Sequence, residues 1–287
     1  MRTASKKSQK KHIVFLNGKF LPLNKAKISI LDRGFIFGDG VYEVVLIRDG
    51  MPLYLYEHLK RLRTSLRAIY CSAKINYSEI TQIISRLLRL NCALCGCYSL
   101  YFQITRGVDA DRNRQFSRNL TPTIFMLLKP IYPLSFEELR CGKAAITAED
   151  IRWRYCHIKS ISLLPTLLLV NQAFRANCEE TIVIREGKVL EGTSSNVFVV
   201  KNGKIFTPLL SEHNLSGVTR DLILKIARRN GMAVVERAVS VSFLRHADEV
   251  WISSSTRGIY PIVKLDGKKI GNGKAGPVWE KINSFLL

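Results

Sequence analysis

Lys159 and Glu191 are the two residues of this chain whose settings point most directly to chemistry. Lys159 lies in the segment EDIRWRYCHIKSISLL (149–164), and the residues that follow it are largely apolar. Glu191 opens a later segment, EGTSSNVF. A lysine whose surroundings disfavour its charged form spends more time as a free amine, which attacks aldehyde carbonyls. The pair therefore indicates Schiff-base chemistry, although a lysine beside apolar residues more often extends into water.

Two further segments could bind a phosphate group. In LSGVTRD, the residues Gly217, Val218 and Thr219 stand at a predicted helix start, where backbone N–H groups and the helix dipole favour an anion. The hydroxyl run that includes Ser254 and Ser255 closes an apolar strand, EVWI. An ordinary helix entry and a polar loop are the simpler explanations of these segments, as a solvated turn is for Glu191. Taken with the lysine, they indicate pyridoxal 5'-phosphate, an aldehyde whose ring acts as an electron sink when an acid keeps it protonated.

The bulk composition predicts a soluble, packed protein. With 287 residues and 47% hydrophobic content, the chain can form two ordinary domains or one large one. Its longest apolar run, ISLLPTLLLV (161–170), contains a proline and is far shorter than the roughly 20 residues of a membrane span. Seven cysteines, an odd number, indicate reduced thiols and a cytoplasmic protein. NCALCGC (91–97) lacks a matching second pair of ligands, so we expect no metal site.

The net charge of +21 leaves a second class of function open. Part of the charge lies in residues 1–11, which carry five basic residues and no acidic one, and which we expect to form a mobile arm. A basic balance can indicate binding to nucleic acid or to an anionic membrane surface. Because the remaining charge is scattered and no nucleic-acid recognition motif is present, we expect neither partner. A non-catalytic, nucleic-acid-associated protein remains the alternative from a different class.

Hydrophobic periodicity predicts an α+β organisation with two domains. From His12 the chain has the pattern of a β-meander with hairpin turns at Asn17-Gly18 and Asp49-Gly50, followed by two helices between Glu57 and Leu90, with Asn76 and Ser78 as turn and cap. Two more strands then lead to prolines at 130 and 133. We therefore expect a small α/β amino-terminal domain over residues 12–132 and a larger domain over residues 133–287.

The second half alternates strands and helices again. A strand (142–150) precedes the lysine segment, and a helix is expected from about Leu163 to Asn177. A second meander follows, with turns at Glu186-Gly187 and Asn202-Gly203, and then a helix that ends at Asn230-Gly231. The carboxyl-terminal part has the pattern of strands.

The order of these segments resembles a known family. RGFIFGDGVYEVV, EHLKRL, EDIRWRYCHIKS, EGTSSNVF, LSGVTRD and the Ser-Thr strand end resemble the fold-type IV pyridoxal-phosphate aminotransferases, most closely the D-amino acid aminotransferases. The resemblance runs from about His12 to the carboxyl end. It implies a two-domain α+β fold with a larger, β-barrel-like carboxyl-terminal domain, a homodimer, and transfer of an amino group from a D-alanine-like substrate to a 2-oxo acid such as 2-oxoglutarate. The same scaffold also serves branched-chain L-amino acid aminotransferases and aminodeoxychorismate lyases.

The resemblance also implies roles for individual residues. Lys159 would bond the cofactor and carry a proton in a ping-pong reaction, and Glu191 would pair with the pyridine nitrogen. Arg61, in EHLKRL, would hold the phosphate, which its planar fork suits. The cofactor would also be lined by Ser194, Ser195, Gly217, Val218, Thr219, Ser254 and Ser255. Tyr42, in FGDGVYEV, would lie at the reacting face.

One segment departs from the pattern of the D-amino acid aminotransferases. Those enzymes present Arg-x-His after a TRG strand end to grip the substrate carboxylate, whereas this chain has TRGVDADRNRQF. Arg112 matches the arginine, and Arg114 stands where the histidine is expected. A second arginine still suits a carboxylate and would favour a substrate with an additional acid group.

Overall fold

The chain folds into two compact units, which meet in sequence between Ile131 and Tyr132. The computed structural model describes residues 12–115, 117 and 119–285. The basic arm of residues 1–11 lies outside the described residues. Each unit combines helices with one main sheet, so the predicted α+β class is confirmed.

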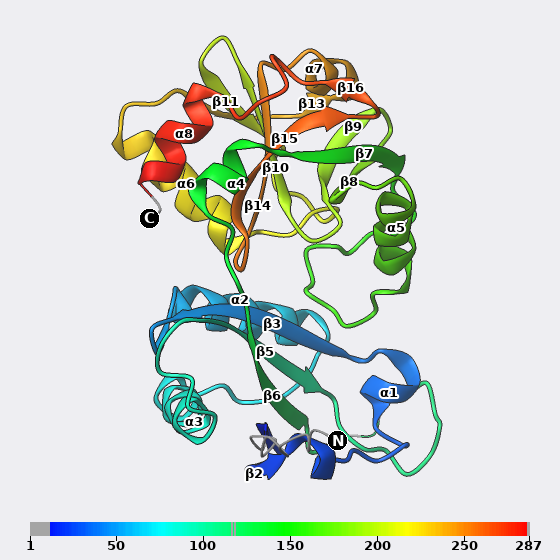
Figure 1. The fold of residues 1–287 in the computed structure, drawn as a ribbon. Helices are drawn as coiled ribbons and strands as arrows, with labels where there is room; N and C mark the ends of the chain where they lie inside the picture. The colour runs from blue at the N-terminus through cyan, green and yellow to red at the C-terminus, as the bar shows by residue number, and fades with distance from the viewer. Residues whose placement is uncertain (1–11, 116, 118, 286–287) are drawn as a thin grey trace, which may run out of the picture. The chain divides into compact units, whose positions relative to one another are not determined.

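The first unit is built on a six-stranded antiparallel sheet with the strand order β2-β1-β6-β5-β3-β4. The elements of this unit are β1 (Ile13–Leu16), β2 (Lys19–Pro22), a 3-10 turn η1 (Leu23–Lys25), α1 (Arg33–Phe37), β3 (Gly40–Arg48), β4 (Met51–Pro52), α2 (Leu55–Ala68), α3 (Tyr77–Leu90), β5 (Cys97–Thr105) and β6 (Thr123–Pro130). Helix α2 packs against β3, as Figure 1 shows, and α3 packs against β1. Alternate residues of β3, such as Val45 and Ile47, are buried beneath the helices.

The predicted hairpin turns are confirmed. At Asn17-Gly18 and Asp49-Gly50 both residues have positive φ, between 46° and 81°. Two consecutive positive φ values define the type I′ turn, whose twist matches that of the flanking strands. The two helices after the meander are also confirmed, and Asn76 caps α3 by accepting a hydrogen bond from the N–H of Glu79. Ser78 lies inside α3 rather than capping it.

Helix α1 was not predicted, because the whole region before Glu57 had the pattern of a meander. It is a short helix set by its ends. The Asp32 side chain accepts a hydrogen bond from the N–H of Gly34 at 2.8 Å, and Gly38 ends the helix with φ +68°. A helix of this length is too short for hydrophobic periodicity to show it.

The second unit is built on a ten-stranded mixed sheet with the order β12-β11-β10-β14-β15-β7-β8-β9-β13, and β16 pairs with β15 beside this path. Its elements are α4 (Phe136–Arg140), β7 (Lys143–Glu149), α5 (Leu164–Arg175), β8 (Glu180–Arg185), β9 (Lys188–Gly192), β10 (Asn196–Lys201), β11 (Lys204–Thr207), α6 (Val218–Arg229), β12 (Val234–Glu236), β13 (Val239–Ser240), α7 (Val241–Arg245), β14 (Glu249–Ser254), β15 (Gly258–Leu265), β16 (Lys268–Lys269) and α8 (Pro277–Ser284). Strand β9 also contacts β10, which lies well away from it in the sheet order, so the sheet curls into a half-barrel.

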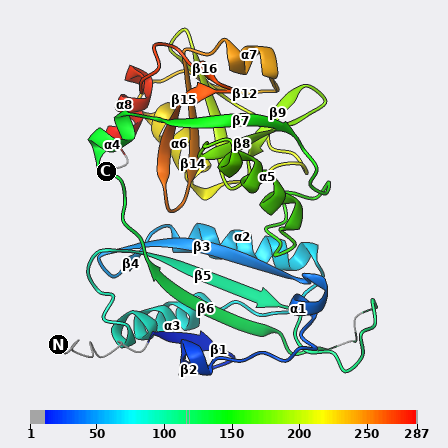
Figure 2. The ribbon, with the colours of Figure 1, turned by 45° about the vertical axis from the view of Figure 1, so that its right-hand side comes forward.

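The curled sheet separates two hydrophobic cores. Val197 and Val199 point into the core inside the curl, while Phe198 and Val200 point into the core beneath α6 and α8. This alternation follows from the period of two along a strand. Helix α5 packs against β8 on another part of the sheet, as Figure 2 shows. Strands β8 to β11, α5 and α6 are present where the sequence predicts them.

Three short helices of this unit were not predicted: α4, α7 and α8. Helix α4 begins with a capping box in which Ser135 and Glu138 satisfy each other's backbone N–H groups. Helix α8 begins at Pro277, and the carboxylate of Glu249 accepts hydrogen bonds from the N–H groups of Val278 and Trp279, both at 2.9 Å. The cap of α8 therefore comes from a distant strand, which sequence periodicity cannot reveal.

Candidate active site

Lys159 lies in an irregular segment between β7 and α5. Consecutive turns shape the segment, since the N–H of Ser160 donates to the carbonyl of Ile158 at 2.8 Å and that of Ser162 donates to Oγ of Ser160 at 3.0 Å. The N–H of His157 donates to the carbonyl of Glu212, which joins the segment to the loop before α6. Lys159 itself is half-buried and follows Ile158. The backbone of this lysine is thus held on both sides.

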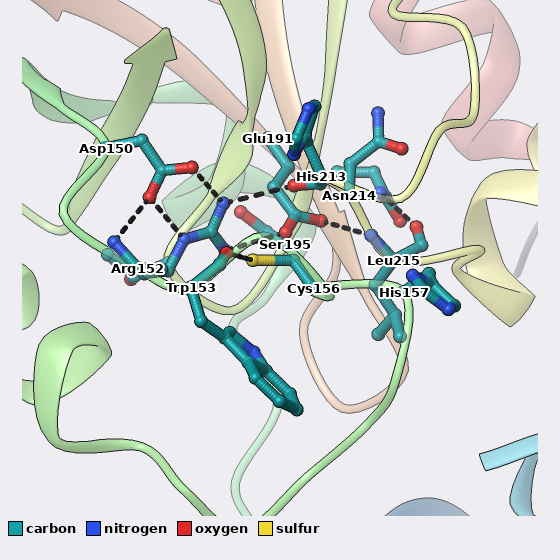
Figure 3. A network of polar contacts seen from close by, with 12 residues as sticks. Asp150, Arg152, Trp153, Cys156, His157, Glu191, Ser195, His213, Asn214 and Leu215 are labelled. Carbon is teal, nitrogen blue, oxygen red and sulfur yellow. Dashed lines mark hydrogen bonds and ion pairs between the residues drawn. The ribbon is translucent and has the colours of Figure 1, made fainter. Parts of the chain in front are cut away.

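Glu191, on β9, is a buried acid within the electrostatic range of this lysine. Its side chain is nearly inaccessible, and the positive charge of Lys159 is among the influences that lower its pKa. One carboxylate oxygen accepts a hydrogen bond from Nη1 of Arg152 at 2.7 Å, and the other accepts one from the N–H of Leu215 at 2.9 Å (Figure 3). Burial raises the pKa of Glu191 above its usual range, and Arg152 is the strongest influence against that rise.

Arg152 is in turn fixed by Asp150. Its Nε and Nη2 atoms donate to the two carboxylate oxygens of Asp150 at 2.8 and 3.1 Å. Arg185 donates to the same carboxylate at 3.1 Å and, from Nη1, to Nδ1 of His213 at 2.6 Å. Burial acts to lower the pKa of Arg152, but Asp150 and Glu191 outweigh it and raise the pKa. The guanidinium therefore stays charged and oriented, which favours the ionised form of Glu191.

Cys156 lies in the same network but does not contribute a charge. Its thiol donates to the carbonyl of Trp153 at 3.1 Å, and burial raises the pKa of Cys156 to about 11 (Figure 3). A thiol with such a pKa stays protonated at neutral pH.

The turn after Glu191 uses its hydroxyl groups within the protein. Ser195 is buried, and its Oγ donates to Oε2 of Glu180 at 2.9 Å, whereas Ser194 is exposed. Their predicted place beside the cofactor stays a prediction.

The start of α6 provides the donors for an anion. Gly217 is the N-cap residue and no side chain caps the helix, so Val218 and Thr219 follow with their N–H groups in the first turn. A Cβ atom at position 217 would lie 1.9 Å from Oδ1 of Asn196, so only glycine allows this close approach. In the sheet, Asn196 pairs with Ser253 of β14. The contact and the pairing together bring the helix start next to the hydroxyl run.

The end of β14 adds hydroxyl groups to this donor set. Oγ of Ser253 is buried and has no hydrogen-bond partner in the described structure. Ser254 and Ser255 are half-buried. An uncapped helix start beside an unsatisfied buried hydroxyl fits a phosphate group. With Lys159 and Glu191 in the same unit, these residues fit pyridoxal phosphate.

The other predicted residues belong to the first unit. Arg61, on α2, donates from Nε and Nη2 to the two carboxylate oxygens of Glu43 at 2.7 and 2.8 Å, and Nδ1 of His58 lies 2.7 Å from the same carboxylate. Two of the five N–H donors of a guanidinium are thereby used. Tyr42 points to the opposite face of β3 from Glu43, where its ring stacks on that of Tyr101 with centroids 5.6 Å apart.

Arg112 and Arg114 are exposed residues of a loop whose backbone is bonded to a buried arginine. Buried Arg33 donates to the carbonyl oxygens of Asn113 and Arg114 at 2.7 and 3.2 Å. The guanidinium of Arg112 lies over the ring of Phe37, 5.4 Å from its centroid. Arg33 therefore anchors the backbone at Asn113 and Arg114, and both Arg112 and Arg114 are exposed.

Several residues of these networks were not predicted, namely Asp150, Arg152, Arg185, Glu180, Glu43 and Arg33. Asp150 and Arg152 stand in the EDIRW segment, so their closeness to Lys159 in sequence was a usable signal. Glu180 and Glu43 occur within strand patterns, where nothing local distinguishes a buried partner from a surface charge.

Comparison with known proteins identifies the family of the chain. The family model of amino-transferase class IV matches residues 40–265. The chain belongs to the class IV aminotransferases. Members of this class depend on pyridoxal phosphate. As an aminotransferase, the protein is an enzyme that acts on small amino and 2-oxo acids.

Its curated relatives include D-alanine aminotransferases. That of Staphylococcus haemolyticus is 38% identical over 269 residues, which cover 94% of each chain, and that of Bacillus licheniformis is 38% identical over 273 residues, which cover 95% of each chain. The fold is also similar to that of the branched-chain amino acid aminotransferase of Escherichia coli, with a TM-score of 0.89 and 26% identity over 96% of this chain and 94% of the other. The branched-chain amino acid aminotransferase of the archaeon Thermoproteus uzoniensis, solved with norvaline, shares the fold with a TM-score of 0.84 and 23% identity over 96% of this chain and 93% of the other.

The described parts of this aminotransferase contain neither a membrane-spanning helix nor a metal-binding cluster. No helix in them is both long and apolar enough to cross a membrane. Over the same residues, no cluster of three or more His, Cys, Asp or Glu side chains has the arrangement of a metal site.

Proposed function

We propose that this aminotransferase transfers the amino group of a D-amino acid, such as D-alanine, to a 2-oxo acid such as 2-oxoglutarate or pyruvate. Identity of 38% to D-alanine aminotransferases over nearly the whole chain supports this substrate class. The observation that carries the chemistry is the buried Glu191, which is bonded to Arg152 and lies within the electrostatic reach of Lys159.

In this proposal, pyridoxal phosphate supplies a reactive aldehyde and a ring that disperses negative charge. Lys159 would hold the cofactor through Nζ and would move a proton from the substrate α-carbon. Glu191 would hold the protonated ring nitrogen, and the charge of Arg152 would favour the ionised carboxylate against the effect of burial. Gly217, Val218, Thr219, Ser254 and Ser255 would hold the phosphate, a role that we also assign to Arg61, and Ser194 and Ser195 would line the ring.

The substrate side of the proposal rests on the first unit. Tyr42 lies at the reacting face, and Arg112 and Arg114 bind the substrate carboxylate. The loop fits this task because Arg33 fixes its backbone and both arginine side chains are exposed. A ping-pong sequence follows, because one amino acid must leave as its 2-oxo acid before the second 2-oxo acid enters.

Branched-chain L-amino acid transamination is the second candidate, favoured by the TM-score of 0.89 to the Escherichia coli enzyme. A half-reaction separates the two. The purified protein, loaded with pyridoxal phosphate, is mixed with D-alanine, D-glutamate or L-leucine alone, and conversion of the bound cofactor to its amine form is followed by absorbance. We expect the D-amino acids to react and L-leucine to react at least about 100-fold more slowly.

The control variant is Lys159→Ala, which lacks the attacking amine and should lose both the visible absorbance of the bound cofactor and turnover. Full activity of this variant would disprove the assignment of Lys159. Faster reaction with L-leucine than with either D-amino acid would instead establish the second candidate.

We also propose that the enzyme is a cytoplasmic homodimer. All seven cysteines are free thiols, which suits a reducing compartment. Helix α5 bears exposed apolar side chains, including Leu164, Leu168 and Phe174, which suit burial against a second copy. Light scattering of the purified protein should give twice the mass of the chain.

A further inference from the structure

The turn that follows Glu191 is wrapped around one buried carboxylate, that of Glu180 at the start of β8. The N–H of Gly192 donates to the carbonyl of Ser195 at 2.7 Å and closes the turn. Oε1 of Glu180 accepts hydrogen bonds from the N–H of Thr193 at 3.0 Å and from the Thr193 hydroxyl, and Oε2 accepts from Oγ of Ser195 at 2.9 Å. Glu180 is only 2% exposed. Both ends of the turn therefore depend on the same side chain.

The fit around this carboxylate leaves little freedom. A Cβ atom at position 192 would lie 2.2 Å from Oγ of Ser195 and 3.0 Å from Cδ of Glu180. The turn can therefore follow this course only with glycine next to Glu191. Any displacement of the turn would also move Glu191, because Glu191 and Gly192 are consecutive residues of β9.

The same carboxylate also faces the segment after the hydroxyl run of β14. Nη1 of Arg257 lies 3.8 Å from Oε2 of Glu180 and 3.5 Å from Oε1 of Glu179. Arg257 is two residues from Ser255. Glu180 thus lies between the turn that follows Glu191 and the segment with Ser254 and Ser255, whose hydroxyl groups we assign to the phosphate.

We propose that Glu180 is a positioning residue for the cofactor site. Its carboxylate holds the 192–195 turn, and with it Glu191 and Ser195, against the end of β14 that carries Ser254 and Ser255. The inference rests on the proposed function, because it assigns these two segments to one cofactor. Glu180 acts through hydrogen bonds to the turn and does not touch the reacting atoms. A hydrogen-bonded carboxylate behind binding residues contributes in this way because small displacements of those residues weaken binding.

The test is the affinity of the cofactor-free protein for pyridoxal phosphate, measured by tryptophan fluorescence during titration. Glu180→Ala removes both carboxylate oxygens that accept from the turn, and we expect its dissociation constant to rise at least about tenfold. Glu180→Gln should recover affinity to within about threefold of the natural chain, because its amide oxygen can accept both bonds from Thr193 and its amide nitrogen can donate to Ser195.

Glu179→Gln is the matched control, since it removes the neighbouring carboxylate at Arg257 but no bond to the turn. We expect its affinity to stay within about twofold of the natural chain. Equal weakening in this control would attribute the effect to the charge of Arg257 and overturn the proposal. If Glu180→Ala does not fold, Thr193→Val replaces it, because this change removes the Thr193 hydroxyl and leaves the carboxylate.

The outcomes separate this inference from the proposed function. If the natural chain binds pyridoxal phosphate and reacts with D-alanine, but Glu180→Ala, or Thr193→Val in its place, binds within twofold of it, only the role of Glu180 is disproved. If the natural chain does not bind pyridoxal phosphate, both proposals are disproved.

Discussion

Glu191 is a buried acid whose pKa reflects opposing influences, in which burial acts against the charge of Arg152 and the N–H of Leu215. Burial raises its pKa, while the guanidinium of Arg152, 2.7 Å away, acts in the opposite direction. The ionised carboxylate is the form that can hold a protonated ring nitrogen. The chemistry proposed for Glu191 therefore depends on Arg152 as much as on Glu191 itself.

Replacement of Arg152 by methionine should move the pH dependence of turnover. Loss of the adjacent cation removes the strongest influence that lowers the pKa of Glu191, so this pKa rises further. Activity needs the carboxylate and is lost as pH falls through this pKa, so the acidic limb of the kcat profile should move to higher pH. Arg154→Met is the control, because Arg154 is 67% exposed and pairs with Glu212 instead. An unmoved acidic limb in Arg152→Met would contradict this account.

Glu43, in the first unit, is a buried acid whose pKa is lowered rather than raised. It is fully buried, and burial alone would raise its pKa, but the charge and hydrogen bonds of Arg61, together with His58, lower the pKa from 4.5 to about 2. A carboxylate with a depressed pKa stabilises the fold above its unfolded pKa, and this stability is lost as pH falls through the folded value. At about 1.4 kcal/mol per pH unit, the contribution is about 3 kcal/mol.

Acid unfolding of Glu43→Gln should measure this contribution. Near neutral pH, we expect the free energy of unfolding of the variant to be about 3 kcal/mol below that of the natural chain, since Arg61 is left without its carboxylate. Between pH 4.5 and about 2 the two free energies should converge, because protonation of Glu43 in the natural chain has the same effect. Glu57→Gln, an exposed change in α2, should preserve the full pH dependence. Denaturant unfolding at several pH values supplies the comparison.

At the scale of elements, the start of α6 joins two strands of the second unit. Gly217 lies against Asn196 of β10, which pairs with Ser253 at the end of β14. The close approach at Gly217, together with the hydrogen bond from Nδ2 of Asn196 to the carbonyl of Leu215 at 2.9 Å, therefore places the helix start beside the hydroxyl run. Glycine is required there for space, since its φ of −73° is open to any residue.

Gly217→Ala should weaken phosphate binding through displacement of α6. The added Cβ would lie 1.9 Å from Oδ1 of Asn196, so the helix start or Asn196 must move. We expect the dissociation constant for pyridoxal phosphate to rise at least about tenfold and stability to fall by about 1 to 3 kcal/mol. Calorimetry with and without the cofactor measures both effects. In an Asn196→Ala background the same substitution should cost less, and an unchanged cost would rule out the steric cause.

At the scale of the whole molecule, we expect the net charge of +21 to play no part in catalysis. Truncation of the chain to His12 removes five basic residues and leaves every acidic residue in place. We expect the transamination rate of the truncated chain to stay within about twofold of the full chain, and its retention on a cation exchanger to fall, because exposed charges act over about a Debye length. DNA binding that depends steeply on salt and survives the truncation would favour the nucleic-acid alternative instead.

Much of this protein was determined by local sequence. The hairpins at Asn17-Gly18 and Glu186-Gly187 follow from residues that adopt positive φ, and α3 and α6 follow from apolar residues at helical spacing. The candidate residues Lys159 and Glu191 were also visible, because the chemistry of an amine beside an acid depends on residue type. Short helices such as α1 and α4 were missed, since their ends rather than their periodicity define them.

Only the tertiary structure decided the partners of the buried charges. Arg152 bonds Glu191 across 39 positions of the chain, and Arg33 holds the loop of Arg112 and Arg114 across about 80. Glu180 meets Ser195 and Arg257 only because β8, β9 and the end of β14 converge in the curled sheet. A charge in a strand pattern has no local mark of burial, and its pKa depends on atoms that folding brings near it. The sequence therefore determined which groups could react, and the fold decided which of them are held charged and in place.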